Sequence, residues 1–431
     1  MTHLDRRQFL LGTTALFAVG AIGINPVMSA ETRMRLIFWG GQARADRTYG
    51  VTDLYTKANP GVTFDGEFMA FQDYWPKLAT QTAGGNSPDV IQMDYRYIVE
   101  YANRNAIAPL DEFVGKHLML DDFDADQLDG GKVGGKLYGI SLGANSVAMI
   151  VNKAAFEEAG VPVPDANTSY EDLPKLAEAW KAGNKRAGMA LWQDGSGTEP
   201  GLENWLRQRG KALYTAEGKA GFEAQDITDW FQMWNDLRDA GVTVSPDDQA
   251  LDATDAIENT MVTLGKAAVT YANSNQLIAF QAVNKDPLTM TNYPRAKAGS
   301  MGGHYRKPSM FFSLGASSTQ KEEGAKFINF FITDPEGAKI LGVERGIPCK
   351  SSTRDAIAST LDAQSQIALN FVSNLGDLLG KLPPSPPANA GEVSVAFKTK
   401  SQEVAFGQQS PADAGPAFYQ QAVEILARAK K

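Results

Sequence analysis

The stretch Arg35-Leu36-Ile37-Phe38-Trp39-Gly40-Gly41-Gln42 largely determines the predicted fold. It contains a continuous apolar run from Leu36 to Phe38, whose strand-forming residues predict a buried strand. The glycine pair ends this strand, and a helical pattern begins near Ala45. A buried strand that leads into a helix is typical of an open α/β sheet, in which ligands bind outside the carboxyl ends of the strands.

The residues that follow this strand are suited to binding a sugar. Trp39, Gly41 and Gln42 offer an aromatic face, an exposed backbone and an amide. A buried hydroxyl group needs hydrogen-bond partners, and the apolar face of a pyranose ring needs a flat surface to pack on. The alternative is that Trp39 is a core residue at the end of the strand, and the stretch alone leaves both interpretations open.

Length and composition limit the class of protein. A chain of 431 residues is too long for one ordinary core and predicts two domains or lobes. Its 43% hydrophobic and 21% charged residues are typical of a soluble globular protein. The net charge of −9, without basic blocks, argues against nucleic acid or an anionic membrane as partner.

Residues 1–30 have the pattern of a signal peptide. Arg6 and Arg7 precede an apolar stretch over residues 11–24, and a small-residue cleavage site ends at Ala30. The Arg-Arg-x-Phe-Leu pattern resembles a twin-arginine signal, with an ordinary Sec signal as the alternative. We therefore expect export to a bacterial periplasm. The single cysteine, Cys349, excludes an internal disulfide.

Strand and helix patterns alternate through the first third of the chain. Strands are expected near residues 36–39, 62–68 and 89–93, and this order predicts a mainly parallel sheet with right-handed crossovers. The ends of the later strands would bring Gln72, and Asp94 with Tyr95, to the same edge of the sheet as Trp39. Alternatively, Asp94 is a helix N-cap and Tyr95 packs on the core.

Further candidates follow in the rest of the chain. Strands at residues 188–192 and 267–271 would deliver Trp192 and then Asn273 and Asn275 to a second binding edge. Other candidates lie where the chain is expected to cross between lobes or to form a loop; these are Asn145, His304, Tyr305 and Arg345. Each has a structural alternative, such as a turn, a core position or an ion pair.

Most catalytic and metal-binding motifs are missing from the sequence. It has no Gly-Lys-Ser/Thr phosphate loop, no His-Glu-x-x-His, no cysteine pair and no Gly-x-Ser-x-Gly elbow. We therefore expect no cofactor and no metal site. The acidic run at residues 121–126 is interpreted as a solvated start of a helix rather than a calcium loop, because it lacks the central glycine and final glutamate. A pair of catalytic carboxylates is not excluded by sequence.

Several short motifs, in order, resemble one known family. They are Trp39-Gly40-Gly41, Gly135-Lys136-Leu137-Tyr138-Gly139-Ile140, Met149-Ile150-Val151-Asn152-Lys153 and Arg345-Gly346-Ile347-Pro348. Over essentially the whole chain after residue 30, this order resembles the periplasmic solute-binding proteins of ABC-type sugar importers, the family that includes maltose-binding protein. Family members usually carry Gly-x-Trp after the strand equivalent to residues 267–271. Here the sequence is Ala272-Asn273-Ser274-Asn275, so amides replace the stacking ring.

The resemblance implies a two-lobe α/β fold, with a mainly parallel sheet in each lobe and helices around it. Three hinge crossings are placed near Asn145, Pro308 and Gln364. Lobe 1 would comprise residues 31–145 and 308–364, and lobe 2 residues 146–307 and 365–431. The predicted ligand contacts are Trp39, Gly41, Gln42, Gln72, Asp94, Tyr95, Asn145, Trp192, Asn273, Asn275, His304, Tyr305 and Arg345.

The function implied is binding rather than catalysis. A monomeric receptor would capture a neutral or acidic sugar and deliver it to the membrane permease of an ABC importer. Two alternatives remain at this point: an exported carbohydrate-active enzyme such as a glycosidase, and a receptor of the same fold for a non-sugar such as a polyamine.

Overall fold

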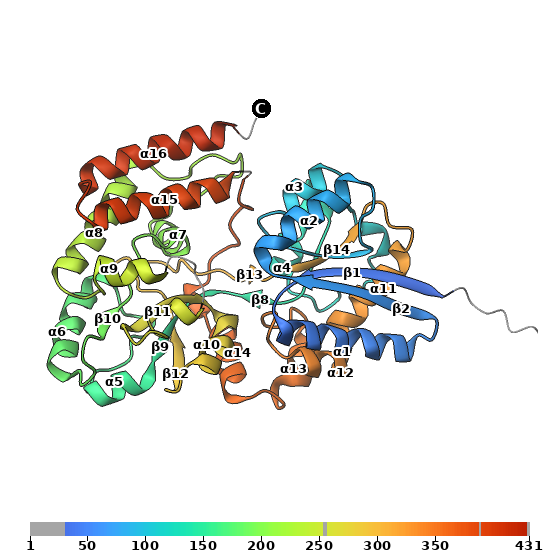
Figure 1. Ribbon diagram of the computed structural model, residues 1–431, viewed down its shortest axis with the longest axis horizontal. Coiled ribbons are helices and arrows are strands. Elements are labelled where there is room, and N and C mark those ends of the chain that lie inside the picture. The colour runs from blue at the N-terminus through green and yellow to red at the C-terminus, as the bar shows by residue number, and fades with distance from the viewer. Residues whose placement is uncertain (1–30, 253–256, 388, 429–431) are drawn as a thin grey trace, which may run out of the picture.

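The computed structural model describes residues 31–252, 257–387 and 389–428, so the predicted signal peptide lies outside the described residues. Figure 1 shows two α/β halves side by side, each built around its own sheet. Within the described ranges, no helix has both the length and the apolar character needed to span a membrane.

The first sheet has the order β2-β1-β3-β14-β4, with β7 also paired to β14. Its strands are β1 (Thr32–Trp39), β2 (Val62–Met69), β3 (Val90–Met93), β4 (Ile107–Ala108), β7 (Ile140–Ser141) and β14 (Phe311–Gly315). Strand β1 pairs in parallel with β2 and β3, whereas β14 runs antiparallel to β3, β4 and β7. Five of the six strands therefore run in the same direction, as predicted for a mainly parallel sheet, and only β14 runs the opposite way. The reason is that β14 enters after the chain returns from the other half, not through a local helical crossover.

The apolar run that opens the chain is buried on both faces. Leu36 and Phe38 pack in a core cluster with Phe312, whereas Ile37 packs in another cluster with Ile91. All five of these side chains are at most 1% exposed. Covering both faces of a strand requires a continuous apolar sequence rather than an alternating one, which confirms the predicted buried strand.

Helices surround the first sheet (Figure 1). They are α1 (Gln42–Ala58), α2 (Phe71–Ala83), α3 (Ile98–Asn103), α4 (Ala125–Gly130), α11 (Lys321–Thr333), α12 (Pro335–Leu341) and α13 (Ser351–Ala358). A short hairpin of β5 (Lys132–Val133) and β6 (Lys136–Leu137) lies beside α4 in sequence.

The second sheet has the order β10-β11-β9-β12. Its strands are β9 (Val147–Asn152), β10 (Ala190–Trp192), β11 (Ala267–Asn273) and β12 (Leu288–Thr291). Strands β10 and β11 pair in parallel, and β9 runs antiparallel to both β11 and β12. Three of the four strands therefore run in the same direction, and β9 runs the opposite way because it enters directly from the connection between the halves.

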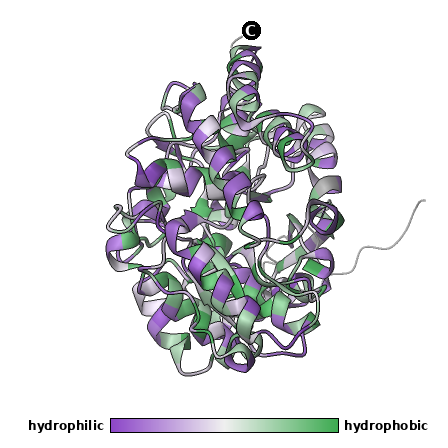
Figure 2. Cartoon of the chain, turned by 90° about the vertical axis from the view of Figure 1, so that its left-hand side faces the viewer, coloured by the Kyte–Doolittle hydropathy of each residue, from purple (hydrophilic) through white to green (hydrophobic). Residues whose placement is uncertain are grey.

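The helices of this half enclose an aromatic core. They are α5 (Lys153–Ala159), α6 (Leu173–Gly183), α7 (Glu199–Gln208), α8 (Ala224–Asp239), α9 (Pro246–Gln249), α10 (Leu277–Val283), α14 (Ala363–Ser373), α15 (Ala390–Ala405) and α16 (Pro411–Arg428). Trp192, Trp230 and Trp234 are fully buried in one cluster. In Figure 2, where this half faces the viewer, hydrophilic residues lie mainly on the outer helices and hydrophobic residues gather among the central segments.

The two halves are joined by a short antiparallel ribbon. Strand β8 (Ala144–Asn145) pairs with β13 (Lys307–Pro308), and Ala144 also forms a bridge with Ile347. The proline-rich segment at residues 382–387 leads towards α15, and the hydroxyl of Tyr95 donates to the carbonyl oxygen of Pro383 at 2.9 Å. Segments far apart in sequence therefore meet where the halves join.

Candidate functional site

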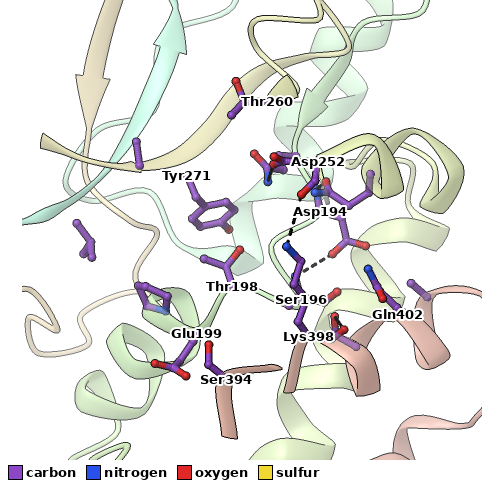
Figure 3. Close-up of a pocket in the computed structure, with 18 of the residues that line it drawn as sticks. Asp194, Ser196, Thr198, Glu199, Asp252, Thr260, Tyr271, Ser394, Lys398 and Gln402 are labelled. Atoms are coloured by element: carbon purple, nitrogen blue, oxygen red, sulfur yellow. Dashed lines mark hydrogen bonds between the residues drawn. The ribbon is translucent and has the colours of Figure 1, made fainter. Parts of the chain in front are cut away.

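A cavity of about 390 Å³ lies at the carboxyl edge of the second sheet (Figure 3). Strands β10 and β11 are parallel, so the residues that follow both strands lie at this edge. The wall includes Gln193 and Asp194 after β10, Asn273 at the end of β11, and residues of the loop into α7. Helix α15 closes one side, and Arg96, which follows β3 of the first sheet, reaches the cavity from the other half. This is the position at which open α/β sheets bind ligands.

A hydrogen-bonded network fixes the acidic residues of the wall. One oxygen of Asp194 accepts a hydrogen bond from the Arg238 guanidinium at 2.7 Å, and the other accepts from the backbone N–H of Ser196 at 2.8 Å. The carboxylate of Asp252 accepts from the side-chain amide of Gln193 at 3.1 Å. Asp194 and Asp252 are both buried, so these donors compensate for lost hydration and hold the polar wall in one geometry.

Glu199 is the first residue of α7 and has a different environment. Its carboxyl oxygen Oε2 is buried and has no hydrogen-bond partner among the described residues. Burial raises the pKa of Glu199, and the positive charge of Arg96 offsets part of this effect. The group therefore favours its neutral, proton-donating form more than an ordinary glutamate does.

The cavity also has aromatic and hydroxyl surface. Tyr271 reaches the cavity from β11, near Thr198 in Figure 3, and Phe280 is part of the wall. Phe406, just after α15, lines the cavity and is 45% exposed. Rings combined with hydroxyls, amides and fixed carboxylates can hold a polar ligand that also has apolar faces.

The predicted contacts around Trp39 lie away from this cavity. Trp39 is 8% exposed, and its ring packs against Phe71, Tyr74 and Trp75 at centroid distances of 5.4, 5.2 and 5.6 Å. It is a core residue, as the alternative interpretation had it, because α2 places three rings over the strand end.

Two neighbouring predicted contacts also fall outside the cavity wall. Gly41 precedes α1, and the Gln42 amide donates to Asp46 at 2.7 Å. The predicted contact Gln72 belongs to α2, and its side chain lies outside the described part of the structure. These positions lie near the edge of the first sheet, where Trp39 and its neighbouring rings pack together.

At the end of β3, the predicted contacts lie directly before the residue that lines the cavity. One carboxylate oxygen of Asp94 accepts from the backbone N–H of Arg96 at 2.8 Å, and Tyr95 is 5% exposed. Neither side chain lines the cavity, whereas the next residue, Arg96, does. Asp94 stabilises the turn that presents Arg96, while Tyr95 bonds to the segment of residues 382–387.

At β10, as at β3, the cavity is lined by the residues that follow the predicted contact. At β11 the predicted residue itself lines the cavity. Trp192 is fully buried in the core, and the next two residues, Gln193 and Asp194, line the cavity instead. Asn273 lies in the cavity wall at the predicted edge, although its contact with a ligand stays a prediction. Asn275 is directed elsewhere, since its amide donates to the carbonyl oxygen of Glu344 at 3.4 Å.

Three of the predicted residues, Asn145, His304 and Tyr305, lie at or near the connections between the halves. Asn145 is 7% exposed in β8, and its Oδ1 has no hydrogen-bond partner among the described residues. His304 is 1% exposed, its Nε2 accepts from the backbone N–H of Tyr293 at 3.3 Å, and burial lowers its pKa to about 3. The Tyr305 hydroxyl donates to a carboxylate oxygen of Glu203 at 2.8 Å. None of the three lines the cavity.

Arg345 is neither a surface residue nor a residue of the cavity wall. It is 3% exposed and donates to the Thr48 hydroxyl at 2.8 Å. Its guanidinium lies 6.0 Å from the Phe38 ring centroid and 5.4 Å from that of Phe331. Burial lowers its pKa to about 9, with a further contribution from the charge of Arg44. Packing in the first half encloses this cation, which sequence alone placed in an open loop.

The acidic run at residues 121–126 leads into helix α4, as predicted, but two of its carboxylates form ion pairs rather than being only solvated. Asp124 lies 3.3 Å from Arg306 and 2.7 Å from Arg354, and Asp126 lies 2.9 Å from Arg306. Among the described residues, no group of three or more His, Cys, Asp or Glu side chains is arranged to hold a metal ion.

The residues missed by sequence reasoning come from separate parts of the chain. They are Arg96, Gln193, Asp194, Ser196, Thr198, Glu199, Asp252, Tyr271, Ser394 and Lys398. Extending the predicted candidates at the ends of β3 and β10 by one or two residues would have found Arg96, Gln193 and Asp194. No local signal marks Ser394 and Lys398, because α15 reaches the cavity only through the tertiary fold.

Residues 51–364 match the family of bacterial extracellular solute-binding proteins, and the chain belongs to this family. A Brucella abortus protein named as a binding protein is 24% identical over 197 residues, which are 45% of this chain and 46% of that protein. The match thus spans about half the length of such curated relatives.

Solved structures show the same fold over nearly the whole chain. A solute-binding protein of Alicyclobacillus acidocaldarius is 28% identical, with a TM-score of 0.74 over 92% of this chain and 99% of that one. A periplasmic solute-binding protein of Pectobacterium atrosepticum is 22% identical, with a TM-score of 0.81 over 93% and 100%. An oligogalacturonide-binding protein of Yersinia enterocolitica is 22% identical, with a TM-score of 0.79 over 93% and 100%.

Proposed function

We propose that this solute-binding protein is the sugar receptor of an ABC importer and binds its ligand in the cavity at the edge of the second sheet. The observation that carries the proposal is the composition of the cavity wall. Gln193 and Asn273 provide amides, Asp194 is a fixed acceptor, and Tyr271 provides a ring with a hydroxyl. Sugar hydroxyls need such paired donors and acceptors, while the apolar face of a sugar needs an aromatic surface.

The ligands named for proteins of the same fold agree with this choice. The Yersinia enterocolitica protein was determined with digalacturonic acid. A Listeria monocytogenes ABC substrate-binding protein with a TM-score of 0.74 was determined with cycloalternan, and a Streptomyces glaucescens receptor with a TM-score of 0.72 with acarbose. All three ligands are carbohydrates, which supports a saccharide of one or more rings.

In this proposal the two halves are lobes that close over the ligand. Lobe 1 comprises residues 31–145 and 308–364, and lobe 2 comprises residues 146–307 and 365–431. The paired strands β8 and β13 support crossings near Asn145 and Pro308. The contacts of α13 with α12, and of α14 with β12, support a third crossing between these helices, near Gln364. A ligand favours closure only if it makes better contacts in the closed state than in the open state. In this proposal Arg96 of lobe 1 contacts the ligand in the closed state.

Closure would also define the partner and the place of action. The closed receptor would dock on the permease of an importer and release the sugar there, and residues 1–30 would direct the protein to the periplasm. Membership of an extracellular solute-binding family supports this location. The receptor would bind its ligand without changing it.

Isothermal titration calorimetry of residues 31–431 tests the function. The titrants are neutral and acidic mono- and oligosaccharides, together with spermidine as a non-sugar. Calorimetry is preferable to tryptophan fluorescence because no tryptophan is among the described residues that line the cavity. Saturable binding of one saccharide class supports the proposal. Binding of spermidine alone, or sustained release of hydrolysis products from a bound oligosaccharide, contradicts it.

A further inference from the structure

Arg96 is the one residue of the described cavity wall that comes from the chain before Asn145. Its side chain is exposed, and within the described ranges no carboxylate lies within ion-pair distance of it. Arg104, further along the same segment, differs in this respect because it pairs with Glu100 at 2.7 Å. Arg96 therefore directs an uncommitted guanidinium to a cavity that belongs mostly to the other half.

The fixed acids of the wall are engaged by the protein itself. Asp194 accepts from Arg238 and from the Ser196 backbone, and Asp252 accepts from Gln193. These bonds hold the two carboxylates in place deep in the second half. Glu199, the first residue of α7, lies in the same wall, and among the basic residues Arg96 has the largest effect on its pKa.

Glu199 is poorly suited to be a permanent anionic partner of Arg96. Its Oε2 is buried without a hydrogen-bond partner among the described residues, and no ion pair joins it to Arg96. Burial raises its pKa, which favours the neutral carboxyl group. A neutral Glu199 can donate a hydrogen bond to a ligand oxygen and does not repel an anion.

We propose that the cavity selects a sugar acid of the uronate type and that the Arg96 guanidinium binds the ligand carboxylate across the space between the halves. This inference rests on the proposed sugar-binding function and specifies its substrate class. Arginine suits the task because its planar fork of N–H donors matches the two oxygens of a carboxylate. Helix α7 begins at the same wall, and the positive end of its dipole adds to the attraction for an anion.

The test compares uronate and neutral saccharides in calorimetry with the complete chain of residues 31–431. The probes are digalacturonate, the matching neutral galactose disaccharide, and glucosamine as a cationic sugar. Arg96→Gln is expected to weaken digalacturonate binding by about 10- to 100-fold, the range for losing a charge-assisted hydrogen bond. It should change binding of the neutral disaccharide by less than about threefold.

Two further variants separate carboxylate binding from other roles of this region. Arg104→Gln removes a nearby exposed arginine that does not line the cavity, and it should leave digalacturonate affinity unchanged. Glu199→Gln keeps an uncharged polar group at the cavity wall, so the preference for digalacturonate over glucosamine should persist in this variant. Melting temperatures of all three variants verify that they are folded.

Different outcomes overturn different claims. Equal weakening of acidic and neutral saccharides by Arg96→Gln would mean that Arg96 stabilises closure and does not read a carboxylate. A preference for glucosamine that disappears in Glu199→Gln would assign the opposite ligand charge. Tight binding of neutral saccharides alone would remove the uronate inference and keep the proposed function, whereas a complete lack of saccharide binding would remove both.

Discussion

The carboxyl edges of the two sheets were expected to serve the same purpose, but their contents differ. At the first edge, the ring of Trp39 is enclosed by the rings of Phe71, Tyr74 and Trp75. At the second edge, Gln193 and its neighbours surround a cavity of about 390 Å³ with hydrogen-bonding groups. A strand end therefore predicts where a site can form, while the side chains brought by the surrounding helices decide whether it is open.

The first edge is tested by removing its central ring. Trp39→Ala is expected to lower the free energy of unfolding by about 3–5 kcal/mol, the usual loss for a large aromatic side chain in a packed core. It should leave ligand affinity unchanged in the folded fraction. Urea denaturation and calorimetry measure the two effects. A stable variant with strongly weakened binding would return Trp39 to the ligand site.

The second edge is tested through the buried pair of Asp194 and Arg238, whose side chains are 2% and 9% exposed. Asp194→Ala leaves the Arg238 cation without its carboxylate partner, so we expect a loss of about 3 kcal/mol in the free energy of unfolding. Because Asp194 also lines the cavity, ligand affinity should fall as well. Urea denaturation and calorimetry check these results.

A matched control for this change is available at the first sheet. Asp65 pairs with Arg33, but their side chains are 53% and 70% exposed. Asp65→Ala should alter stability by less than about 1 kcal/mol, as is usual for exposed ion pairs. An Asp194→Ala variant as stable as Asp65→Ala would show that the polar wall is not a fixed network.

His304, near the connection between the halves, should have a smaller effect on stability, and this effect depends on pH. His304 has its folded pKa lowered to about 3 by burial, against an ordinary value of 6.5. Between these values only the unfolded chain binds the proton, so stability falls as the pH drops from about 6.5 towards 3. The slope due to His304 is up to about 1.4 kcal/mol per pH unit.

Urea midpoints measured across this pH range test the role of His304. The variant His304→Gln lacks the titrating ring, so its stability should depend less steeply on pH than that of the parent chain. Identical slopes for the two proteins would show that His304 takes up a proton in the folded state.

Much of the fold could be predicted because its signals are local. The apolar run before Trp39 predicted a buried strand, and strand β11 delivers Asn273 to the second edge as expected. The reversed directions of β9 and β14 could not be predicted in this way. Both strands enter their sheets from the connections between the halves.

The site was harder to predict for three physical reasons. Which residue at a strand end faces outward depends on the register, and a shift of one position exchanges Trp192 for Gln193. The three aromatic rings around Trp39 come from the later helix α2, so its burial is a tertiary property. Lys398 reaches the cavity from α15, which is distant in sequence from every strand of that edge.

The most direct test of the account blocks each edge with the same substitution. Gln402 on α15 lines the cavity, whereas Gln42 lies at the start of α1 beside the first edge, and both side chains are exposed. Calorimetric titration of Gln402→Trp and Gln42→Trp with the tightest-binding saccharide compares the two sites. The account predicts that Gln402→Trp weakens binding at least about 10-fold by filling the cavity, while Gln42→Trp binds like the parent protein. Strong loss of affinity in Gln42→Trp, with normal binding in Gln402→Trp, would place the ligand at the first edge and contradict it.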